Sequence, residues 1–235
     1  MAELELFEAI HTARSLRRLK PDPVPEALIT RVLDAAIRAP SAGNAQNWAF
    51  LVVRDPERRR ALGDIYRKAS KIAEAMYAAK GRPPHMTERQ YERMMATGAY
   101  LWERMGDAPV ILIPSLRSAS VPPAASLPPD IRARYQDELA YVQRIRGASI
   151  YPAVQNILLA CRALGLGTTI TTNHLRCEDE VRALLGLPAD VDTFAMMPIG
   201  WPVDRFGPLT RRPLGEVVHA DGWGIAWPGQ MGNRV

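Results

Sequence analysis

Three short clusters of polar residues could bind an anionic ligand. The segment Arg14-Ser15-Leu16-Arg17 places two guanidinium groups and a hydroxyl close together, and Arg211-Arg212-Pro213 offers two further guanidinium groups. Because a guanidinium group forms paired hydrogen bonds with phosphate oxygens, both clusters favour phosphate binding. The segment 40–46, which reads PSAGNAQ, is rich in small residues and amides, so its backbone could approach a planar ring closely. Each cluster alone is equally typical of a charged loop, a helix-to-strand turn or a basic tail.

Motifs of several other catalytic classes do not occur in the sequence. There is no phosphate loop GxxxxGK(S/T), no HExxH zinc motif, no GxSxG nucleophile elbow and no GxGxxG at the start of a βαβ unit. The four histidines lack the spacing of metal ligands, and Cys161 and Cys177 form no CxxC pair. The sequence therefore predicts no metal site and no catalytic nucleophile.

Composition indicates a globular protein of 235 residues, 47% of them hydrophobic and 23% charged. The longest apolar run, Ala108 to Pro114, is much shorter than the ~20 residues of a membrane span, and the acidic start of the chain does not resemble a secretory signal. The net charge of +5 permits nucleic-acid binding, but the densest basic run, 54–60, mixes both signs and is typical of a solvated helix face. We therefore expect a cytoplasmic protein with no membrane and no nucleic-acid partner.

Helices and strands alternate along the predicted chain, and helices dominate. Apolar periodicity and capping residues predict helices over 4–11, 26–39, 55–79, 87–105, 130–146, 150–164 and 178–185. Short apolar or β-branched runs predict strands over 49–53, 110–113, 168–172 and 194–199. We expect surface loops over 41–47 and 115–129 and an irregular tail from Arg205. This order indicates one α+β domain.

The predicted helix 150–164 is apolar on nearly every face. Ile150, Val154, Ile157, Leu158 and Leu164 leave little polar surface around it. A helix of this kind is buried either at the centre of a core or against another subunit.

Four segments, in order, resemble one family. The first is Arg14-Ser15-Leu16-Arg17; the second, 40–48, reads PSAGNAQNW and precedes the strand sequence FLVV; the third, 152–168, begins PAVQN and ends GLGT. The fourth, 198–202, reads PIGWP and precedes Arg211-Arg212-Pro213. Together they span roughly residues 8–218, and the chain resembles the FMN-dependent nitroreductases and their flavoreductase relatives. Two positions depart from the usual pattern, since Ala13 stands where many relatives have arginine and Asn47 where they have proline.

The resemblance implies a mainly antiparallel central sheet flanked by helices, in an intertwined homodimer with FMN at the subunit interface. Helix 150–164 would then be the central helix of the dimer. Residues 70–146 would form a variable insertion of helices and loops that shapes the substrate cavity. Residues 203–235 would form a C-terminal extension around the other subunit.

The resemblance also implies a set of cofactor-binding residues. Arg17 would lie near the flavin N1 and C2 carbonyl, where a fixed cation stabilises the charge of the reduced ring. The phosphate and ribityl chain would contact Arg14 and Ser15, with Leu16 between Ser15 and Arg17. The edge of the ring would contact Pro40, Ser41, Ala42, Asn44 and Gln46, and the surroundings of N5 would be formed by Ile170, Thr171 and Thr172. The phosphate would also contact Arg211 and Arg212.

The activity that the resemblance implies is ping-pong hydride transfer. NADH or NADPH would reduce the flavin, and an electrophilic small molecule such as a nitroaromatic, a quinone or an enone would then accept two electrons. No catalytic side chain is needed, because the cofactor carries the chemistry. The alternatives are a protein that binds or sequesters flavin without turnover, and a flavin-fragmenting or dehalogenating enzyme of the same fold.

Overall fold

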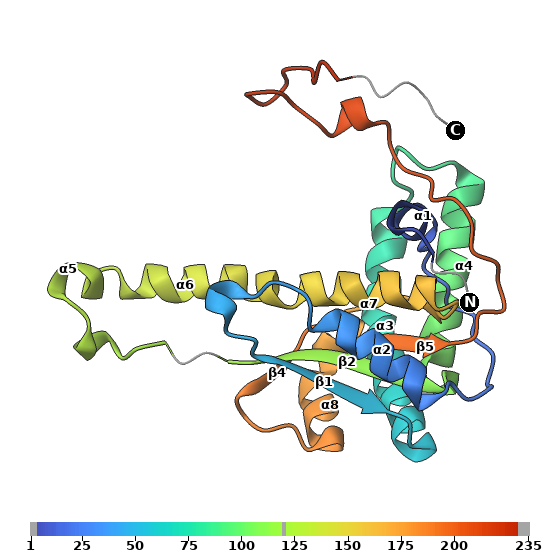
Figure 1. The fold of residues 1–235 in the computed structure, drawn as a ribbon, viewed down its shortest axis with the longest axis horizontal. Helices are drawn as coiled ribbons and strands as arrows, with labels where there is room; N and C mark the ends of the chain where they lie inside the picture. Colours follow the sequence, from blue (N-terminus) through green and yellow to red (C-terminus); the bar gives the residue numbers. More distant parts are fainter. Residues whose placement is uncertain (1–3, 119–120, 230–235) are drawn as a thin grey trace.

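The computed structural model describes residues 4–118 and 121–229, and it has the expected α+β architecture (Figure 1). The helices are α1 (Leu6–Thr12), α2 (Glu26–Ala36), α3 (Pro56–Lys80), α4 (Glu88–Arg104), α5 (Pro129–Arg132), α6 (Tyr135–Ile145), α7 (Tyr151–Ala163) and α8 (Glu178–Leu185). The strands are β1 (Trp48–Val53), β2 (Val110–Arg117), β3 (Gly167–Thr168), β4 (Val191–Thr193) and β5 (Met197–Gly200).

The sheet is antiparallel throughout its described pairings, as expected. Its order is β1-β2-β5-β3, and the short strand β4 also pairs with β2. Trp48 of β1 pairs with Leu116, and Ile199 of β5 pairs with Val110. Because β2 has partners along both of its edges, it continues to Arg117, beyond the predicted end at residue 113.

Two strand predictions need correction. The predicted strand 168–172 is only the two-residue β3, followed by an isolated bridge between Thr171 and Met196. The predicted strand 194–199 begins later, at Met197, and the preceding β4 was not predicted. The predicted single helix 130–146 is also divided, into α5 and α6.

Helices cover both faces of the sheet, and β2 divides the core between them. Val110 and Leu112 belong to the cluster that packs with α2 and α7, whereas Ile111 and Ile113 belong to the cluster that packs with α3, α4 and α8. Side chains alternate between the faces of a strand, so consecutive residues of β2 enter different clusters. All four of these side chains are fully buried.

The α3–α4 layer is built by local signals and one close approach. The Asp55 side chain accepts the Arg58 N–H at 2.8 Å and so caps α3, with Pro56 at its first turn. A side chain on Gly63 of α3 would lie 2.8 Å from the backbone nitrogen of Gly106, just after α4. Glycine at both positions lets the two backbones touch, which fixes how α4 lies against α3.

Two segments extend away from the body of the domain. In Figure 1, α5 and α6 continue the line of α7 beyond the sheet, and the chain after β5 leaves the body on another side. Helix α6 buries none of its side chains, and Tyr141 and Ile145 are exposed on it. Helix α7 buries Val154 and Ile157, but its Leu158 is only half-buried within the single chain. Within this chain, therefore, the burial expected for α7 holds on one face only.

Candidate functional site

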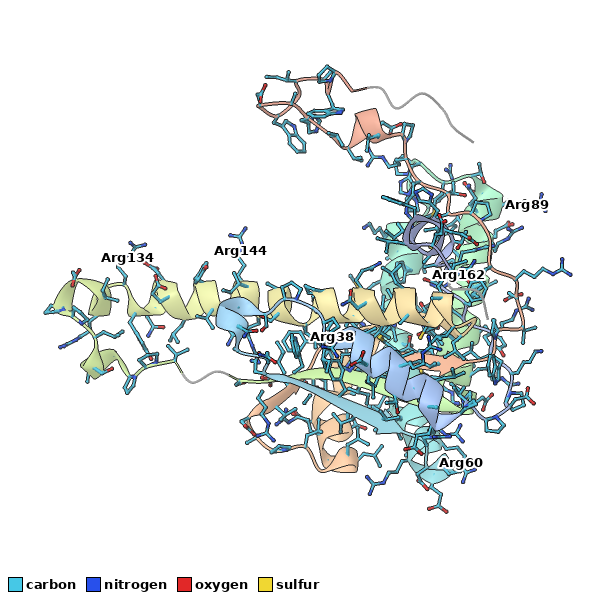
Figure 2. The ribbon with its side chains drawn as sticks, in the orientation of Figure 1. Arg38, Arg60, Arg89, Arg134, Arg144 and Arg162 are labelled. Atoms are coloured by element: carbon cyan, nitrogen blue, oxygen red, sulfur yellow. The ribbon has the colours of Figure 1, made fainter. Side chains whose placement is uncertain are left out.

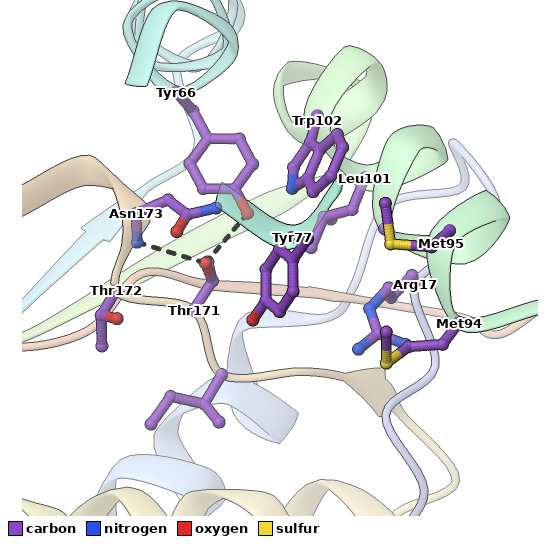
Figure 3. A pocket seen from close by; sticks show the side chains of 12 residues that line it. Arg17, Tyr66, Tyr77, Met94, Met95, Leu101, Trp102, Thr171, Thr172 and Asn173 are labelled. Atoms are coloured by element: carbon purple, nitrogen blue, oxygen red, sulfur yellow. Dashed lines mark hydrogen bonds between the residues drawn. The ribbon is translucent and has the colours of Figure 1, made fainter. Parts of the chain in front are cut away.

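A cavity of about 260 Å³ lies between α3, α4 and the segment that follows β3 (Figure 3). Four predicted site residues line it, namely Arg17, Ile170, Thr171 and Thr172. The other lining residues were not predicted as site residues and are Tyr66, Tyr77, Met94, Met95, Gly98, Leu101, Trp102 and Asn173. The wall thus combines aromatic, thioether and aliphatic groups with a cation, hydroxyl groups and an amide.

The Thr171 hydroxyl is held by its neighbours. The Tyr66 hydroxyl lies 2.9 Å from Thr171 Oγ1, and the backbone N–H of Asn173 donates to the same oxygen at 3.4 Å (Figure 3). The Asn173 side chain donates in turn to Ser70 Oγ at 3.4 Å. Burial raises the pKa of Tyr66, which is 1% exposed, so the phenol remains neutral at physiological pH. The backbone bridge to Met196 fixes the main chain of Thr171.

Arg17 is a half-buried cation without a carboxylate partner. Its guanidinium group makes no side-chain hydrogen bond or ion pair within residues 4–118 and 121–229, and burial lowers its pKa. The next residue behaves differently, because Arg18 donates to the Asp204 carboxylate at 3.0 Å. Leu16, which is 3% exposed, anchors this segment in the core. A desolvated charge of this kind is stabilised by an anionic ligand.

A second, smaller hollow of about 40 Å³ lies beside the cavity. Arg14 and Ser15 line it together with residues of α7, β3 and the C-terminal segment. Ile170 lines both spaces, so the two are adjacent. The structure therefore places the Arg14–Arg17 segment and the residues after β3 on the walls of two adjacent spaces.

The loop 40–46 lies elsewhere in the same chain. The Ala42 N–H donates to Ser149 Oγ at 3.1 Å, and the Trp48 indole donates to the Ser149 carbonyl at 2.6 Å, just before α7 begins. Within the loop, the Ser41 hydroxyl accepts the Gln46 N–H at 3.0 Å. The small hollow contacts α7 near its other end, and a helix of 13 residues spans about 20 Å. Pro40, Ser41, Ala42, Asn44 and Gln46 are thus not gathered with Arg14 and Arg17 within one chain.

Arg211 and Arg212 lie in a third space. They line an open hollow of about 990 Å³ between the C-terminal segment and the turn before α4, which includes His85. Arg212 donates to the Glu216 carboxylate at 2.8 Å. None of the residues that line this hollow lines the other two, so one chain alone does not bring these arginines to Arg14.

The sequence contained a signal for one of the missed residues. Leu62, Tyr66, Ala69 and Ala73 recur at helical spacing and are all buried along α3. A tyrosine in such a stripe needs a hydrogen-bond partner for its hydroxyl, which makes it a candidate for a polar site. For Trp102 and the methionines of α4, no local pattern indicates that they line a cavity, because that depends on how α4 crosses α3.

The described residues give little support to a metal site, a nucleophilic thiol or a membrane span. No group of three or more His, Cys, Asp and Glu side chains there could hold a metal ion. Burial raises the pKa of the Cys161 thiol to about 12, so this cysteine does not act as a nucleophile. In the part of the chain that the structure describes, no helix is both long enough and apolar enough for a bilayer span.

Comparisons with known proteins agree on one family. The family model described as the nitroreductase family matches residues 10–201. An NADH dehydrogenase of Thermus thermophilus is 31% identical over 220 residues, covering 87% of this chain and 90% of the relative. Iodotyrosine deiodinase 1 of Rattus norvegicus is 26% identical over 202 residues, covering 86% of this chain and 64% of the relative.

Solved structures share the fold. A crystal structure of oxidized iodotyrosine deiodinase bound to FMN and 3-iodo-L-tyrosine gives a TM-score of 0.63 at 21% identity, covering 93% of this chain and 99% of that one. A BluB-like flavoprotein of Clostridium difficile 630 gives 0.65 at 21% identity, covering 92% and 99%. The resemblance drawn from the four sequence segments is confirmed, and the chain belongs to the nitroreductase family.

Proposed function

We propose that this protein is an FMN-dependent oxidoreductase that uses NADH or NADPH to reduce an electrophilic small molecule, such as a nitroaromatic, a quinone or an enone. Its family, a relative named NADH dehydrogenase and a structural neighbour bound to FMN support this proposal. The observation that carries it is Arg17, a half-buried guanidinium group without a carboxylate partner among the described residues, on the wall of a cavity.

The residues present fit FMN chemically. The cofactor has an anionic tail, a polar ring edge that becomes negative on reduction, and a flat apolar ring. The Arg14–Arg17 segment offers hydrogen-bond donors and positive charge, and the adjacent cavity has aromatic walls from Tyr77 and Trp102. Bound FMN supplies the hydride chemistry that no side chain of this protein provides.

Arg17 and Thr171 would each act on the ring electrostatically. A fixed cation stabilises negative charge more strongly in a desolvated site than in water, so Arg17 favours the reduced state. When Tyr66 and the Asn173 N–H both donate to Thr171 Oγ1, the Thr171 hydroxyl proton is free to point into the cavity. Thr171 is then a prepositioned donor, and the neutral Tyr66 keeps it in that state.

A homodimer would complete the site. The loop 40–46 and the Arg14 segment lie toward opposite ends of α7. If two copies pack with their α7 helices antiparallel about a twofold axis, the loop of each copy comes to the Arg14 segment of the other. The half-buried Leu158 and the exposed Phe7 would be covered in such a dimer. We propose that Ser41, Asn44 and Gln46 reach the flavin of the partner subunit in this way.

The first experiment is direct. Purified protein should be yellow, release flavin on denaturation, and run as a dimer in size-exclusion chromatography. It should oxidise NADH or NADPH in the presence of menadione or a nitrofuran. Colourless protein that takes up no added FMN would contradict the proposal, and bound flavin without turnover would favour the sequestering alternative.

Reductive dehalogenation is the second candidate. Relatives of this chain are named iodotyrosine deiodinase, and one structural neighbour holds 3-iodo-L-tyrosine. The aromatic cavity wall of Tyr77 and Trp102 could stack against a halogenated ring. Anaerobic release of iodide from 3-iodo-L-tyrosine by the reduced protein would favour this activity. Flavin breakdown products formed only under oxygen would favour a flavin-fragmenting enzyme.

A further inference from the structure

We propose that Arg162 of α7 binds the terminal phosphate of the flavin, in a pocket that it forms with Arg14 and Ser15. This assignment rests on the proposed function. Arg162 lies within the family-like segment 152–168, but the cofactor-binding residues that the resemblance implies do not include it. The assignment is carried by the shape of the small hollow, the way Arg162 is held, and a buried hydroxyl that faces the same space.

The small hollow has room for a compact polar group. Its volume of about 40 Å³ corresponds to about three groups the size of a water molecule, which suits a cluster of oxygens and excludes a ring. Ile170 separates it from the larger cavity, so a ligand with a ring and a short tail could occupy both. Ala13 also lines the hollow, at the position where many relatives have arginine. Its small methyl group leaves space in the hollow that an arginine side chain would occupy.

Arg162 is held in one orientation beside this space. Its Nε donates to Thr12 Oγ1 at 2.7 Å, its Nη2 donates to the Glu8 carboxylate at 3.4 Å, and its guanidinium carbon lies 4.4 Å from the centre of the Phe206 ring. The side chain is only 15% exposed. In Figure 2, Arg162 lies toward the end of α7 nearest α1, whereas Arg134, between α5 and α6, projects into solvent.

This arrangement leaves one nitrogen of Arg162 for a ligand. Nε and Nη2 have the partners just named, and Nη1 makes no hydrogen bond to any residue that the structure describes. The stacked Phe206 and the Thr12 hydroxyl keep the guanidinium plane fixed, so little side-chain freedom is lost when an anion binds.

The charges around the hollow favour an anion. Arg14 and Arg162 line it, and Glu8 is the carboxylate that contacts Arg162, at 3.4 Å and with a half-exposed side chain. Asp204, which also interacts with Arg14, is paired with Arg18. The hollow therefore keeps an excess of positive charge.

A buried hydroxyl provides an independent sign of a ligand. Thr168 is 4% exposed, lines the hollow, and its Oγ1 has no hydrogen-bond partner among the described residues. The Thr168 carbonyl accepts the Leu16 N–H at 3.0 Å, so the backbone is fixed while the hydroxyl is left without a partner among the described residues. Buried hydroxyl groups are nearly always hydrogen-bonded, and a phosphate oxygen in the hollow would accept this one.

The simpler alternative is that Arg162 only ties α1 and the C-terminal segment to α7. The two roles differ in one measurable respect. A phosphate contact strengthens the binding of FMN but not of riboflavin, which has the same ring and ribityl chain without the phosphate. A purely structural role affects both ligands equally.

The test is a titration of the full-length apoprotein with FMN and with riboflavin, followed by flavin fluorescence. For Arg162→Ala we expect FMN affinity to fall by about 10- to 100-fold, the range for loss of a hydrogen bond to a charged group, and riboflavin affinity to fall by much less. Arg38→Ala is the matched control, because Arg38, just after the end of α2, is exposed and forms an ion pair with Asp34 of that helix (Figure 2). It should leave both affinities unchanged.

A second variant keeps the assignment testable if Arg162→Ala does not fold. Glu8→Gln removes the carboxylate beside Arg162 with little change in shape, so the preference for FMN over riboflavin should increase. An unchanged FMN-to-riboflavin ratio in whichever of these variants folds overturns the assignment. Wild-type protein that binds neither flavin overturns the proposed function itself, and the assignment with it.

Discussion

The helical layers on the two faces of the sheet differ in what they bury. The layer of α2 and α7 is built largely from apolar side chains such as Val32 and Ile157. The layer of α3, α4 and α8 also has an apolar cluster, but Tyr66, Ser70 and His174 are buried on the same side. Because buried polar groups stabilise a fold less than apolar ones, the second layer holds them at a cost in stability. The candidate cavity lies in this second layer.

The difference suggests a division of roles. The apolar layer is a rigid support whose helix α7 reaches both the loop 40–46 and the Arg14 segment. The polar layer supplies hydroxyl groups of defined orientation to the cavity. Substitutions in the first layer should therefore change stability most, and substitutions in the second should change the chemistry more than the stability.

The largest effect on stability is expected for Ile157→Ala in the apolar layer. Ile157 is fully buried between α7 and the sheet, so truncation should lower the free energy of unfolding by ~2–5 kcal/mol. Urea unfolding at fixed protein concentration measures this loss. Ile72→Ala on the exposed side of α3 is the control, with an expected change within ~0.5 kcal/mol. Equal losses in the two variants would contradict the proposed role of the apolar layer.

The next effect is the pH dependence that His174 gives to the polar layer. Its ring lies 3.2 Å from Thr193 Oγ1, which itself donates to the Glu178 carboxylate, so Nε2 must carry the proton and Nδ1 is a bare acceptor. Nδ1 is buried and has no partner among the described residues, so protonation would bury an unpaired N–H. Burial accordingly lowers the pKa of His174 from 6.5 to about 4.

The sign of the effect follows from that lowered pKa. Below pH 6.5 His174 binds a proton in the unfolded chain but stays neutral in the folded protein. The contribution of His174 to the free energy of unfolding is therefore full above this pH and is lost as the pH falls toward 4. The full loss corresponds to about 3 kcal/mol. Urea unfolding from pH 8 to pH 4 should show a shallower decline for His174→Gln than for wild type. His85→Gln, on an exposed turn, should keep the wild-type profile.

A chemical effect without a large change in stability is expected for Arg17→Ala. Loss of the fixed cation should lower the two-electron reduction potential of bound flavin by about 30 mV, equivalent to about 1.4 kcal/mol. Hydride uptake in rapid-mixing experiments should slow accordingly. Arg18→Ala is a close control, because this neighbouring side chain is paired with Asp204 on the surface. If potentiometry gives equal potentials for the Arg17 variant and wild type, the proposed role of Arg17 is wrong.

Local signals in the sequence predicted most of the helices but not the whole sheet or the site. The range predicted for α3 agrees closely with Pro56–Lys80, because Asp55 caps its start and Gly81 follows its end. Strand β4 was missed because only its pairing with β2, some 75 residues away in the chain, makes those three residues a strand.

The same distinction applies to the site. Arg17 and Thr171 belong to short motifs, and they do line one cavity. Trp102 joins them only because Gly63 and Gly106 set the packing of α4 on α3, which no local pattern contains. The loop 40–46 lies at the far end of α7, and the single chain gives no contact from which its role could be predicted.

Tyr66→Phe is expected to have the smallest effect on stability. It tests most directly whether the polar layer serves the chemistry of the cavity more than the stability of the core. The change removes one hydroxyl from Thr171 Oγ1 and keeps the ring in the core, so the free energy of unfolding should fall by only about 1 kcal/mol. Without that partner the Thr171 hydroxyl can turn away from the cavity, and flavin reduction should slow although FMN affinity is retained. Tyr91→Phe is the matched control, since its exposed hydroxyl donates to the Tyr77 carbonyl at 3.3 Å. A large loss of stability with unchanged reduction kinetics would show that Tyr66 serves the core, and the two layers would then have the same role.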